Sequence, residues 1–205
     1  MICIVDYGIG NIQAFMNLFK RLGMEVRRSD TPDQLLDAER LILPGVGHFD
    51  HAMQQLNDSG MRPKLEELVL GSHVPIVGVC VGMQMLAKGS DEGRLPGLNW
   101  IPGRVRSFAT QPKSADLPLP HMGWNELKLH DYGKIFSKGF DKVPQFYFLH
   151  SYFFDAEDKQ DVAATASYGL DFDAVISRGH IHGVQCHPEK SHHWGEQLLR
   201  NFVEL

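Results

Sequence analysis

The sequence predicts an α/β fold built on a mostly parallel sheet. Short apolar runs at residues 2–6, 40–43 and 74–80 have the composition of strands that are buried on both faces. Between these runs lie segments whose apolar residues recur at helical spacing. Alternation of strand and helix is typical of a doubly wound parallel sheet. The length of 205 residues suits one domain, and we expect a single unit over residues 1–205.

The first half of the chain provides this alternation. A turn at 7–11 follows the first strand, and its Gly8 and Gly10 lack the third glycine of a dinucleotide-binding fingerprint, because Gln13 stands there. We expect, in order, a helix over 12–22, strands over 24–28 and 40–43, helices over 49–56 and 61–70, a strand ending at Cys80 and a helix over 83–88.

The second half has a different character. Residues 89–103 are loop-rich, and residues 111–120 are polar and proline-rich, as in a surface excursion. We expect strands over 146–150, 162–167, 174–177 and 181–187, and a closing helix over 194–203. These strands are joined by turns, and the chain has no internal repeat.

Composition excludes several classes of protein. The net charge of -5 and the absence of a Lys/Arg block do not favour a nucleic-acid or anionic membrane surface. No apolar run approaches the ~20 residues that span a bilayer, and the N-terminus lacks the basic region of a signal peptide. Cys3, Cys80 and Cys186 are few and widely spaced, which favours free thiols in a reducing cytoplasm. We therefore expect a cytoplasmic globular protein.

Cys80 is the candidate nucleophile. It stands where an apolar strand meets a helix, with Gly78 two residues before it and Gly82 two residues after it. This is the Gly-x-nucleophile-x-Gly elbow with cysteine in place of serine. The glycines allow a sharp turn that exposes the nucleophile, and the helix N-terminus favours the thiolate. The alternative is a buried structural cysteine.

His187 and Glu189 are the candidate base and its orienting group, which a thiol nucleophile needs. In an extended backbone, residues two apart share a face, and Pro188 holds His187 extended. The alternative is a surface histidine beside a surface glutamate. Cys186 is a rival nucleophile, but adjacent strand residues point to opposite faces, so we assign Cys186 to the core.

The 11 histidines raise the possibility of a metal site. His180, His182, His192 and His193 lie near Cys186 in the sequence, but no Cys-x-x-Cys or His-Glu-x-x-His spacing accompanies them. We therefore interpret them as polar surface residues and expect no metal and no cofactor.

The turn at 44–47, Pro-Gly-Val-Gly, ends the strand next to that of Cys80. Ligands of open α/β sheets bind at this edge. Gly45 and Gly47 allow backbone N–H groups to approach a ligand and to point at an oxyanion. The alternative is an ordinary glycine-containing turn.

Two motifs are similar to those of class I glutamine amidotransferase domains: Gly-Val-Cys-Val-Gly-Met-Gln at 78–84 and Gly-Val-Gln-Cys-His-Pro-Glu at 183–189. The stretches 44–49, 120–125 and 147–152 resemble one branch, the glutaminase subunits of imidazole glycerol phosphate synthases. The resemblance covers essentially the whole chain. It implies a three-layer, flavodoxin-like α/β fold with a central, mostly parallel sheet and added antiparallel strands.

The resemblance also implies the roles of the site residues. Cys80 would attack the side-chain amide of glutamine, His187 would move the proton from the thiol to the leaving ammonia, and Glu189 would orient His187. The implied substrate-binding residues are Gly45, Val46, Gly47, Val81, Gln84, His150, Ser151 and Tyr152. The backbone N–H of Val81 and one from the 44–47 turn would form the oxyanion hole. We predict that this hole forms only when partner and acceptor bind, because ammonia released earlier is wasted.

In this branch the implied partner is a (β/α)8-barrel cyclase. It forms a heterodimer with the glutaminase and uses the ammonia to make imidazole glycerol phosphate in histidine biosynthesis. The positions that match the junction or ammonia gate are Asn11, His121, Trp124, Tyr147 and Lys190. The alternative for Trp124 and Tyr147 is packing in the core or at its rim.

Three other functions remain open. Residues 189–195 are similar to a paralogous group that supplies ammonia to a sugar amidotransferase of surface-polysaccharide synthesis. A catalytically dead regulatory homologue has no need for Cys80, His187 and Glu189 together. A stress protein with a redox-active cysteine at the same elbow gives no reason for the His-Pro-Glu motif. Release of glutamate from glutamine distinguishes the last two from an ammonia-supplying enzyme.

Overall fold

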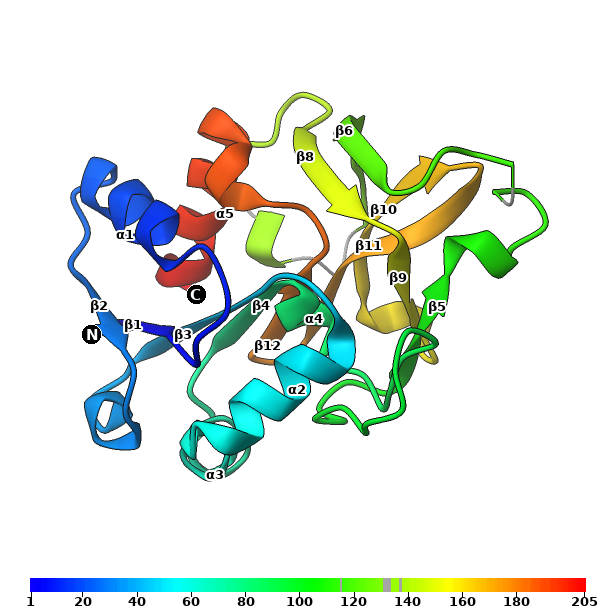
Figure 1. The fold of residues 1–205 in the computed structure, drawn as a ribbon. Helices are drawn as coiled ribbons and strands as arrows, with labels where there is room; N and C mark the ends of the chain where they lie inside the picture. The colour runs from blue at the N-terminus through cyan, green and yellow to red at the C-terminus, as the bar shows by residue number, and fades with distance from the viewer. Residues whose placement is uncertain (115, 131–133, 137) are drawn as a thin grey trace.

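The computed structural model describes residues 1–114, 116–130, 134–136 and 138–205, which form a layered α/β molecule (Figure 1). The α-helices are α1 Ile12–Arg21, α2 Phe49–Asp58, α3 Met61–Glu66, α4 Val81–Gln84 and α5 His192–Glu204. The strands are β1 Ile2–Val5, β2 Val26–Ser29, β3 Arg40–Gly45, β4 Ile76–Cys80, β5 Gly103–Ser107, β6 His121–Glu126, β7 Lys128–Leu129, β8 Gln145–His150, β9 Tyr152–Ala156, β10 Val162–Tyr168, β11 Leu170–Arg178 and β12 Ile181–Val184.

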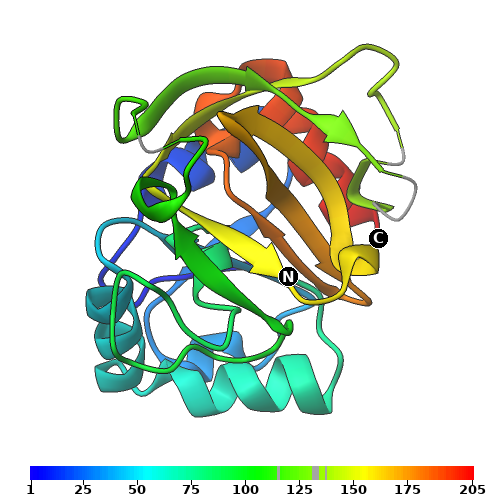
Figure 2. The same ribbon diagram turned by 90° about the vertical axis from the view of Figure 1, so that its right-hand side faces the viewer.

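The central sheet is parallel on one side and antiparallel on the other. Its order is β2-β1-β3-β4-β12-β11-β10-β7, and the pairs from β2 to β12 are all parallel. From β12 onward the pairs are antiparallel, and β9 joins β5 to the sheet beside β11. Figure 2 shows this antiparallel part facing the viewer, with the separate β6–β8 ribbon above it. The expected α/β fold with a mostly parallel sheet and antiparallel additions is confirmed.

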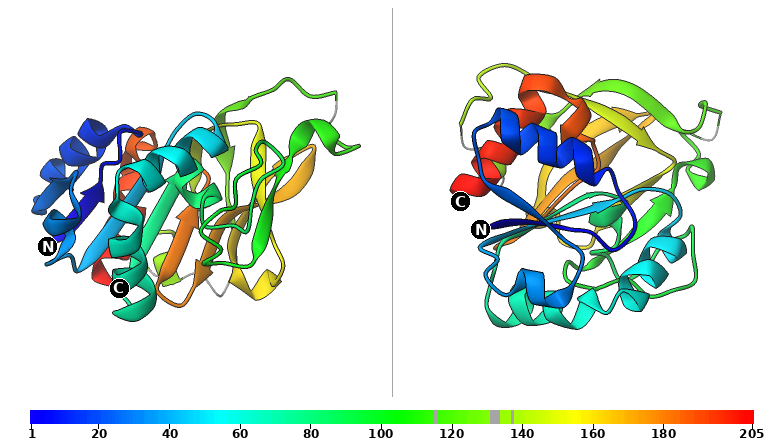
Figure 3. Two further views of the ribbon diagram at one scale, coloured as in Figure 1. Left: turned by 60° about the horizontal axis from the view of Figure 1, so that its bottom comes forward. Right: turned by 60° about the vertical axis from the view of Figure 1, so that its left-hand side comes forward.

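Helices cover both faces of the parallel strands. α1 and α5 lie on one face and α2 and α3 on the other (Figure 3). In α1 the buried side chains are Phe15, Leu18 and Phe19, at the spacing that places them on one stripe of a helix. Gly60, with a φ of 71°, allows the sharp turn between α2 and α3. Within the described residues, no helix has the length and apolarity to cross a membrane.

Several predicted boundaries differ from the structure. The helix expected over 83–88 is α4, which ends at Gln84: the amides of Leu86 and Ala87 bond to carbonyls three residues back, and the Lys88 N–H donates to the Gly103 carbonyl. The predicted helix over 61–70 closes as a π-helical turn at Glu67–Gly71. The strands β6, β7 and β9 were not predicted. The excursion predicted over 111–120 directly follows the 3₁₀ turn Phe108–Thr110, and its residue 115 lies outside the described residues.

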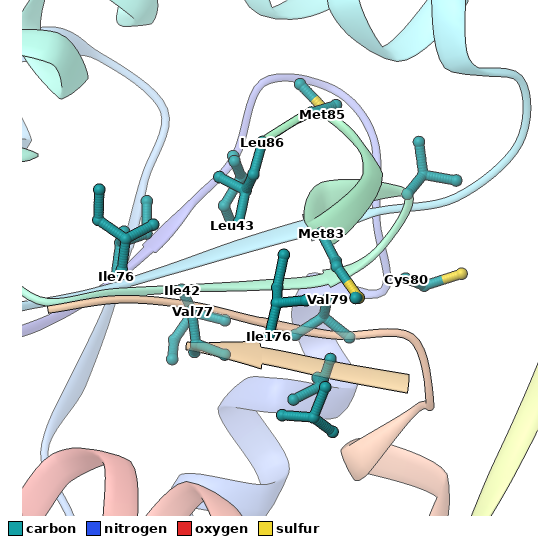
Figure 4. Packing of buried hydrophobic residues seen from close by; sticks show 14 of the residues in the cluster. Ile42, Leu43, Ile76, Val77, Val79, Cys80, Met83, Met85, Leu86 and Ile176 are labelled. Atoms are coloured by element: carbon teal, nitrogen blue, oxygen red, sulfur yellow. The ribbon is translucent and has the colours of Figure 1, made fainter. Parts of the chain in front are cut away.

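The core of the parallel sheet ends at Cys80. Ile42, Leu43, Val77 and Val79 are buried in adjacent strands. Figure 4 shows Cys80 at the end of this cluster, with its sulfur pointing away from the apolar side chains. The packed sheet therefore supplies a rigid base for the residues at its carboxyl edge.

Candidate active site

Cys80 lies where β4 turns directly into α4. Its φ of 56° is strained for a non-glycine residue, as is common at functional turns. A Cβ on Gly82 would overlap the carbonyl oxygen of Leu43, and a Cβ on Gly78 would lie 2.5 Å from the carbonyl oxygen of Gly82. Both flanking glycines are therefore required for the close approach of backbone, and the elbow predicted at this position is present.

A pocket of about 300 Å³ opens beside Cys80. Its lining residues are Val46, Gly47, Cys80, Val81, Gln84, Glu92, Pro120, Leu149, His150, Ser151, Tyr152, His187 and Lys190. Of the predicted substrate-binding residues, Gly45 is the one outside this lining. It pairs with Cys80 across β3 and β4 and packs against the backbone of Gly82.

His187 lines this pocket and contacts Glu189 behind it, but not through the extended strand that the sequence suggested. β12 ends at Val184, so the strand predicted to reach residue 187 is too long. His187 leaves the sheet, its N–H donates to the Tyr147 carbonyl at 2.8 Å, and Glu189 lies in the 3₁₀ turn Pro188–Lys190. In this turn Nδ1 of His187 donates to Oε1 of Glu189 at 2.9 Å.

The environment of His187 favours the protonated ring. Burial alone lowers its pKa, but interactions with the Cys80 sulfur and with Glu189 outweigh burial and raise the pKa to about 10. Within the described residues, Nε2 of His187 and Oε2 of Glu189 are buried without a conventional hydrogen-bond partner. The Nε2 atom is therefore available to the thiol and to a bound molecule. This arrangement suits general acid–base chemistry.

Ser191 fixes the turn that carries these two residues. Its hydroxyl donates to the His187 carbonyl at 2.6 Å and accepts from the Tyr147 N–H at 3.0 Å. Ser191 is fully buried, so both bonds are shielded from water. Together with the bond from the His187 N–H, they attach the turn to β8.

A neutral amide, supported by a second one, also contacts the sulfur. Nε2 of Gln185 donates to the Cys80 sulfur at 3.8 Å, and Oε1 of Gln185 accepts from Nε2 of Gln84 at 3.0 Å. The same Gln84 nitrogen donates to the Tyr152 carbonyl at 3.2 Å. Cys186, by contrast, is fully buried and burial raises the pKa of its thiol, so its assignment to the core is confirmed.

A hydrogen bond from Tyr7 anchors the 44–47 turn. The Tyr7 hydroxyl donates to the Pro44 carbonyl at 2.7 Å, and burial, followed by the charge of Cys80, raises the pKa of Tyr7. Val46 and Gly47 reach the pocket from this turn, and Gly47 has a φ of 85°. The turn is therefore anchored at its base and faces the pocket at its tip. Whether the oxyanion hole forms only on binding stays a prediction.

The residues expected at a partner junction occupy different environments. Trp124 is 47% exposed, contacts Tyr147 edge to face at 6.2 Å and stacks on His192 at 5.3 Å. Nζ of Lys190 lies 5.7 Å from the centre of the Tyr147 ring, and Asn11 is exposed at the start of α1. The side chain of His121, by contrast, is only 4% exposed and points inward to His150.

Glu92 is a pocket residue that sequence analysis missed. It lies in the loop after α4, where no motif marked it, and its Oε2 accepts from the Phe49 N–H at 2.8 Å. Its charge contributes, after burial, to the raised pKa of Tyr152. The signal available in the sequence was a carboxylate close to Cys80 in the chain, which is too weak to identify a pocket residue.

The histidines considered for a metal have other contacts. Nε2 of His180 bonds the Val69 carbonyl at 2.7 Å, and Nδ1 of His182 bonds the Ser177 hydroxyl at 2.8 Å. Because His182 is only 1% exposed, its interpretation as a surface residue was wrong. Among the described residues, no group of three or more His, Cys, Asp or Glu side chains is arranged to hold a metal ion.

Comparison with known proteins identifies the family. Residues 3–205 match the family described as glutamine amidotransferase class-I. The chain is 54% identical over its full length to the whole imidazole glycerol phosphate synthase subunit HisH of Bdellovibrio bacteriovorus, and 43% identical, also over both full lengths, to subunit HisH 2 of Pseudomonas aeruginosa. A solved structure described as a glutamine amidotransferase covers 99% of the chain and 97% of its own, with a TM-score of 0.74 and 19% identity, which shows the fold alone.

The site and these matches place the chain among the glutamine amidotransferases of class I. Within that class it belongs to the family of HisH subunits of imidazole glycerol phosphate synthase.

Proposed function

We propose that this chain releases ammonia from glutamine through a thioester on Cys80. The sulfur attacks the side-chain amide carbon while His187 takes the thiol proton. The C–N bond then breaks, and His187 returns the proton to the leaving ammonia. Water hydrolyses the thioester to give glutamate and the free thiol. The observation that supports these reaction steps is the placement of Cys80 and His187 in one pocket, with Glu189 hydrogen-bonded to Nδ1 of His187.

The pocket offers matching groups for the rest of the substrate. The carboxylate of Glu92 suits the α-ammonium group of glutamine, and the amide of Gln84 and the segment His150–Tyr152 form the walls. The N–H of Val81, at the start of α4, and an N–H of the 44–47 turn would receive the oxyanion. A structure of the free chain with both N–H groups aimed at one point beside Cys80 would contradict a hole that forms only on binding.

We further propose that a (β/α)8-barrel cyclase covers the pocket mouth and receives the ammonia as the second subunit of a cytoplasmic heterodimer. The names of the relatives describe a synthase subunit acting in imidazole glycerol phosphate formation. Met122, Trp124 and Leu149 are exposed on the β6–β8 ribbon, and Leu149 also lines the pocket. An apolar surface at the site entrance suits a partner that keeps ammonia from water.

The deciding experiment measures glutamate release by the purified chain, alone and with a histidine-pathway cyclase and its nucleotide ligand. Cys80→Ala should abolish release, whereas Cys186→Ala, a matched control in the core, should retain it. Survival of activity in Cys80→Ala would overturn the nucleophile assignment. A rise in rate with the cyclase supports the histidine pathway. No rise favours the sugar-modifying acceptor, to which residues 189–195 are similar.

A further inference from the structure

A continuous chain of hydrogen bonds joins the β6–β8 ribbon to the wall of the pocket. Nδ2 of Asn125 lies 3.2 Å from Nε2 of His121, and Nδ1 of His121 lies 3.0 Å from Nε2 of His150. Nδ1 of His150 lies 2.8 Å from the Tyr152 carbonyl oxygen. His150 and Tyr152 line the pocket, but Asn125 and His121 do not.

The acceptors fix the direction of every bond in this chain. The Tyr152 carbonyl can only accept, so Nδ1 of His150 carries a hydrogen. In the neutral ring, Nε2 of His150 is then unprotonated and accepts a hydrogen bond from Nδ1–H of His121. Because Nδ1 of His121 carries the hydrogen, its Nε2 is unprotonated and accepts a hydrogen bond from the Asn125 amide. That amide nitrogen also donates to the Ser167 carbonyl at 2.9 Å, which independently sets its orientation.

The surroundings keep both rings neutral and in place. His121 stacks on Tyr168 at 4.3 Å and on Phe148 at 5.2 Å, and His150 packs against Phe172 at 5.1 Å. Burial lowers the pKa of His121 to about 4 and that of His150 to about 3. An acceptor left without a partner in such an apolar site is costly, so removal of one link affects the next.

The chain continues from the pocket wall to the reactive sulfur. The Tyr152 carbonyl, which receives the His150 hydrogen, also receives one from Gln84. Gln84 donates its other amide hydrogen to Gln185, and Gln185 donates to the Cys80 sulfur. Rotation of His150 would therefore release both the pocket wall and the amide that contacts the nucleophile.

We propose that His121 and Asn125 are positioning residues of the glutamine pocket, which act through His150 without touching the substrate. His121 donates to Nε2 of His150 and so holds the ring in the orientation in which its Nδ1–H bonds the Tyr152 carbonyl. Asn125 in turn selects the tautomer of His121. The identity of the substrate rests on the proposed function, whereas the tautomers do not.

Two variants of similar shape test this role in the full chain assayed with the cyclase. His121→Leu removes the donor to His150, while His121→Asn keeps a donor at the position of Nδ1. We expect the KM for glutamine to rise roughly tenfold in His121→Leu, the effect of one unsatisfied buried acceptor, with a smaller change in kcat. His121→Asn should stay within roughly threefold of the natural protein.

Long-range ¹H–¹⁵N spectra supply a readout that does not depend on activity. The natural protein and His121→Asn should both show His150 protonated at Nδ1, with an unprotonated Nε2 that accepts a hydrogen bond. In His121→Leu the Tyr152 carbonyl still holds the hydrogen on Nδ1, and the Nε2 resonance should shift because its donor is gone. Unchanged His150 nitrogens in His121→Leu, or a lower melting temperature with unchanged KM and kcat, would overturn the proposal. If natural protein releases no glutamate, the proposed function fails while the spectra still decide the tautomers.

A second position covers the case in which His121→Leu does not fold. Asn125→Leu removes the donor to Nε2 of His121 at a half-buried site. It should shift the resonance of that nitrogen and raise the KM severalfold. If neither quantity changes, Asn125 and His121 do not act as a chain and the proposal is wrong.

Discussion

Replacement of Glu189 with glutamine tests how far this carboxylate controls proton transfer at the site. Oε1 of Glu189 accepts from Nδ1 of His187 at 2.9 Å, and the two side chains are 2% and 5% exposed. Burial acts against charge on His187, yet Cys80 and Glu189 together raise its pKa from 6.5 to about 10. Glu189→Gln keeps the size of the side chain and removes its charge.

The pKa shift sets the size of the expected effect. A pKa raised from 6.5 to about 10 corresponds to about 5 kcal/mol in favour of the imidazolium. A hydrogen bond to a charged group is worth about 2 kcal/mol, so loss of the Glu189 charge should lower the imidazolium population by about 30-fold. A glutamine amide can also select the wrong tautomer of His187, and loss of an orienting carboxylate can cost about 10⁴-fold. We therefore expect kcat/KM to fall by about 30-fold to 10⁴-fold.

Two assays separate the electrostatic effect from a general loss of structure. Steady-state glutamate release gives kcat/KM. The rate of Cys80 alkylation by iodoacetamide, followed by mass spectrometry as a function of pH, gives the pH range over which His187 is protonated. In Glu189→Gln the high-pH limb should move to lower pH. Glu67→Gln, which neutralises an exposed carboxylate paired with Lys64, is the control. Unchanged kcat/KM with an unchanged alkylation profile would refute the reasoning.

Two further predictions concern stability. Gly82→Ala places a Cβ against the Leu43 carbonyl, so we expect a loss of about 1–3 kcal/mol in urea unfolding, whereas Gly71→Ala, with open space, should stay within about 0.5 kcal/mol. The pKa values of His121 and His150 are lowered from 6.5 to about 4 and about 3, so the unfolded chain binds their protons first and the stability from these groups falls as pH drops from 6.5 to about 3. The free energy of unfolding of His121→Asn, measured by chemical denaturation, should fall less steeply as the pH drops. An identical pH dependence would contradict the lowered pKa of His121.

The parallel half of the fold could be predicted from the sequence because its elements have strong local signals. β1, β3 and β4 are continuous apolar runs, and the helices between them show a single apolar stripe. The missed strands have weaker patterns. β6 contains a glycine and alternates buried with exposed positions only in part, and β9 is buried at adjacent residues through contacts with both β5 and β11. Such burial depends on neighbours that are distant in the chain.

The reactive centre was predicted because its parts are short motifs, whereas its surroundings are assembled from distant segments. The His187–Glu189 contact was expected on an extended strand, but a 3₁₀ turn held by Ser191 forms it. Glu92 reaches the pocket from a loop whose course depends on hydrogen bonds with distant residues. The inward orientation of His121 follows from its pairing with His150 across β6 and β8, which no local pattern specifies.

The two pocket histidines show how similar local geometry leads to opposite chemistry. His187 and His150 both donate from Nδ1, at 2.9 Å and 2.8 Å, and both are nearly fully buried. The acceptor for His187 is a carboxylate, and its pKa rises to about 10, whereas the acceptor for His150 is a backbone carbonyl, and burial lowers its pKa to about 3. Divergent pKa values in one pocket separate proton carriers from fixed hydrogen-bonding groups. The two charged partners of His187, the Cys80 sulfur and the Glu189 carboxylate, therefore make it the candidate acid and base, whereas His150 has no such partner and remains a neutral support.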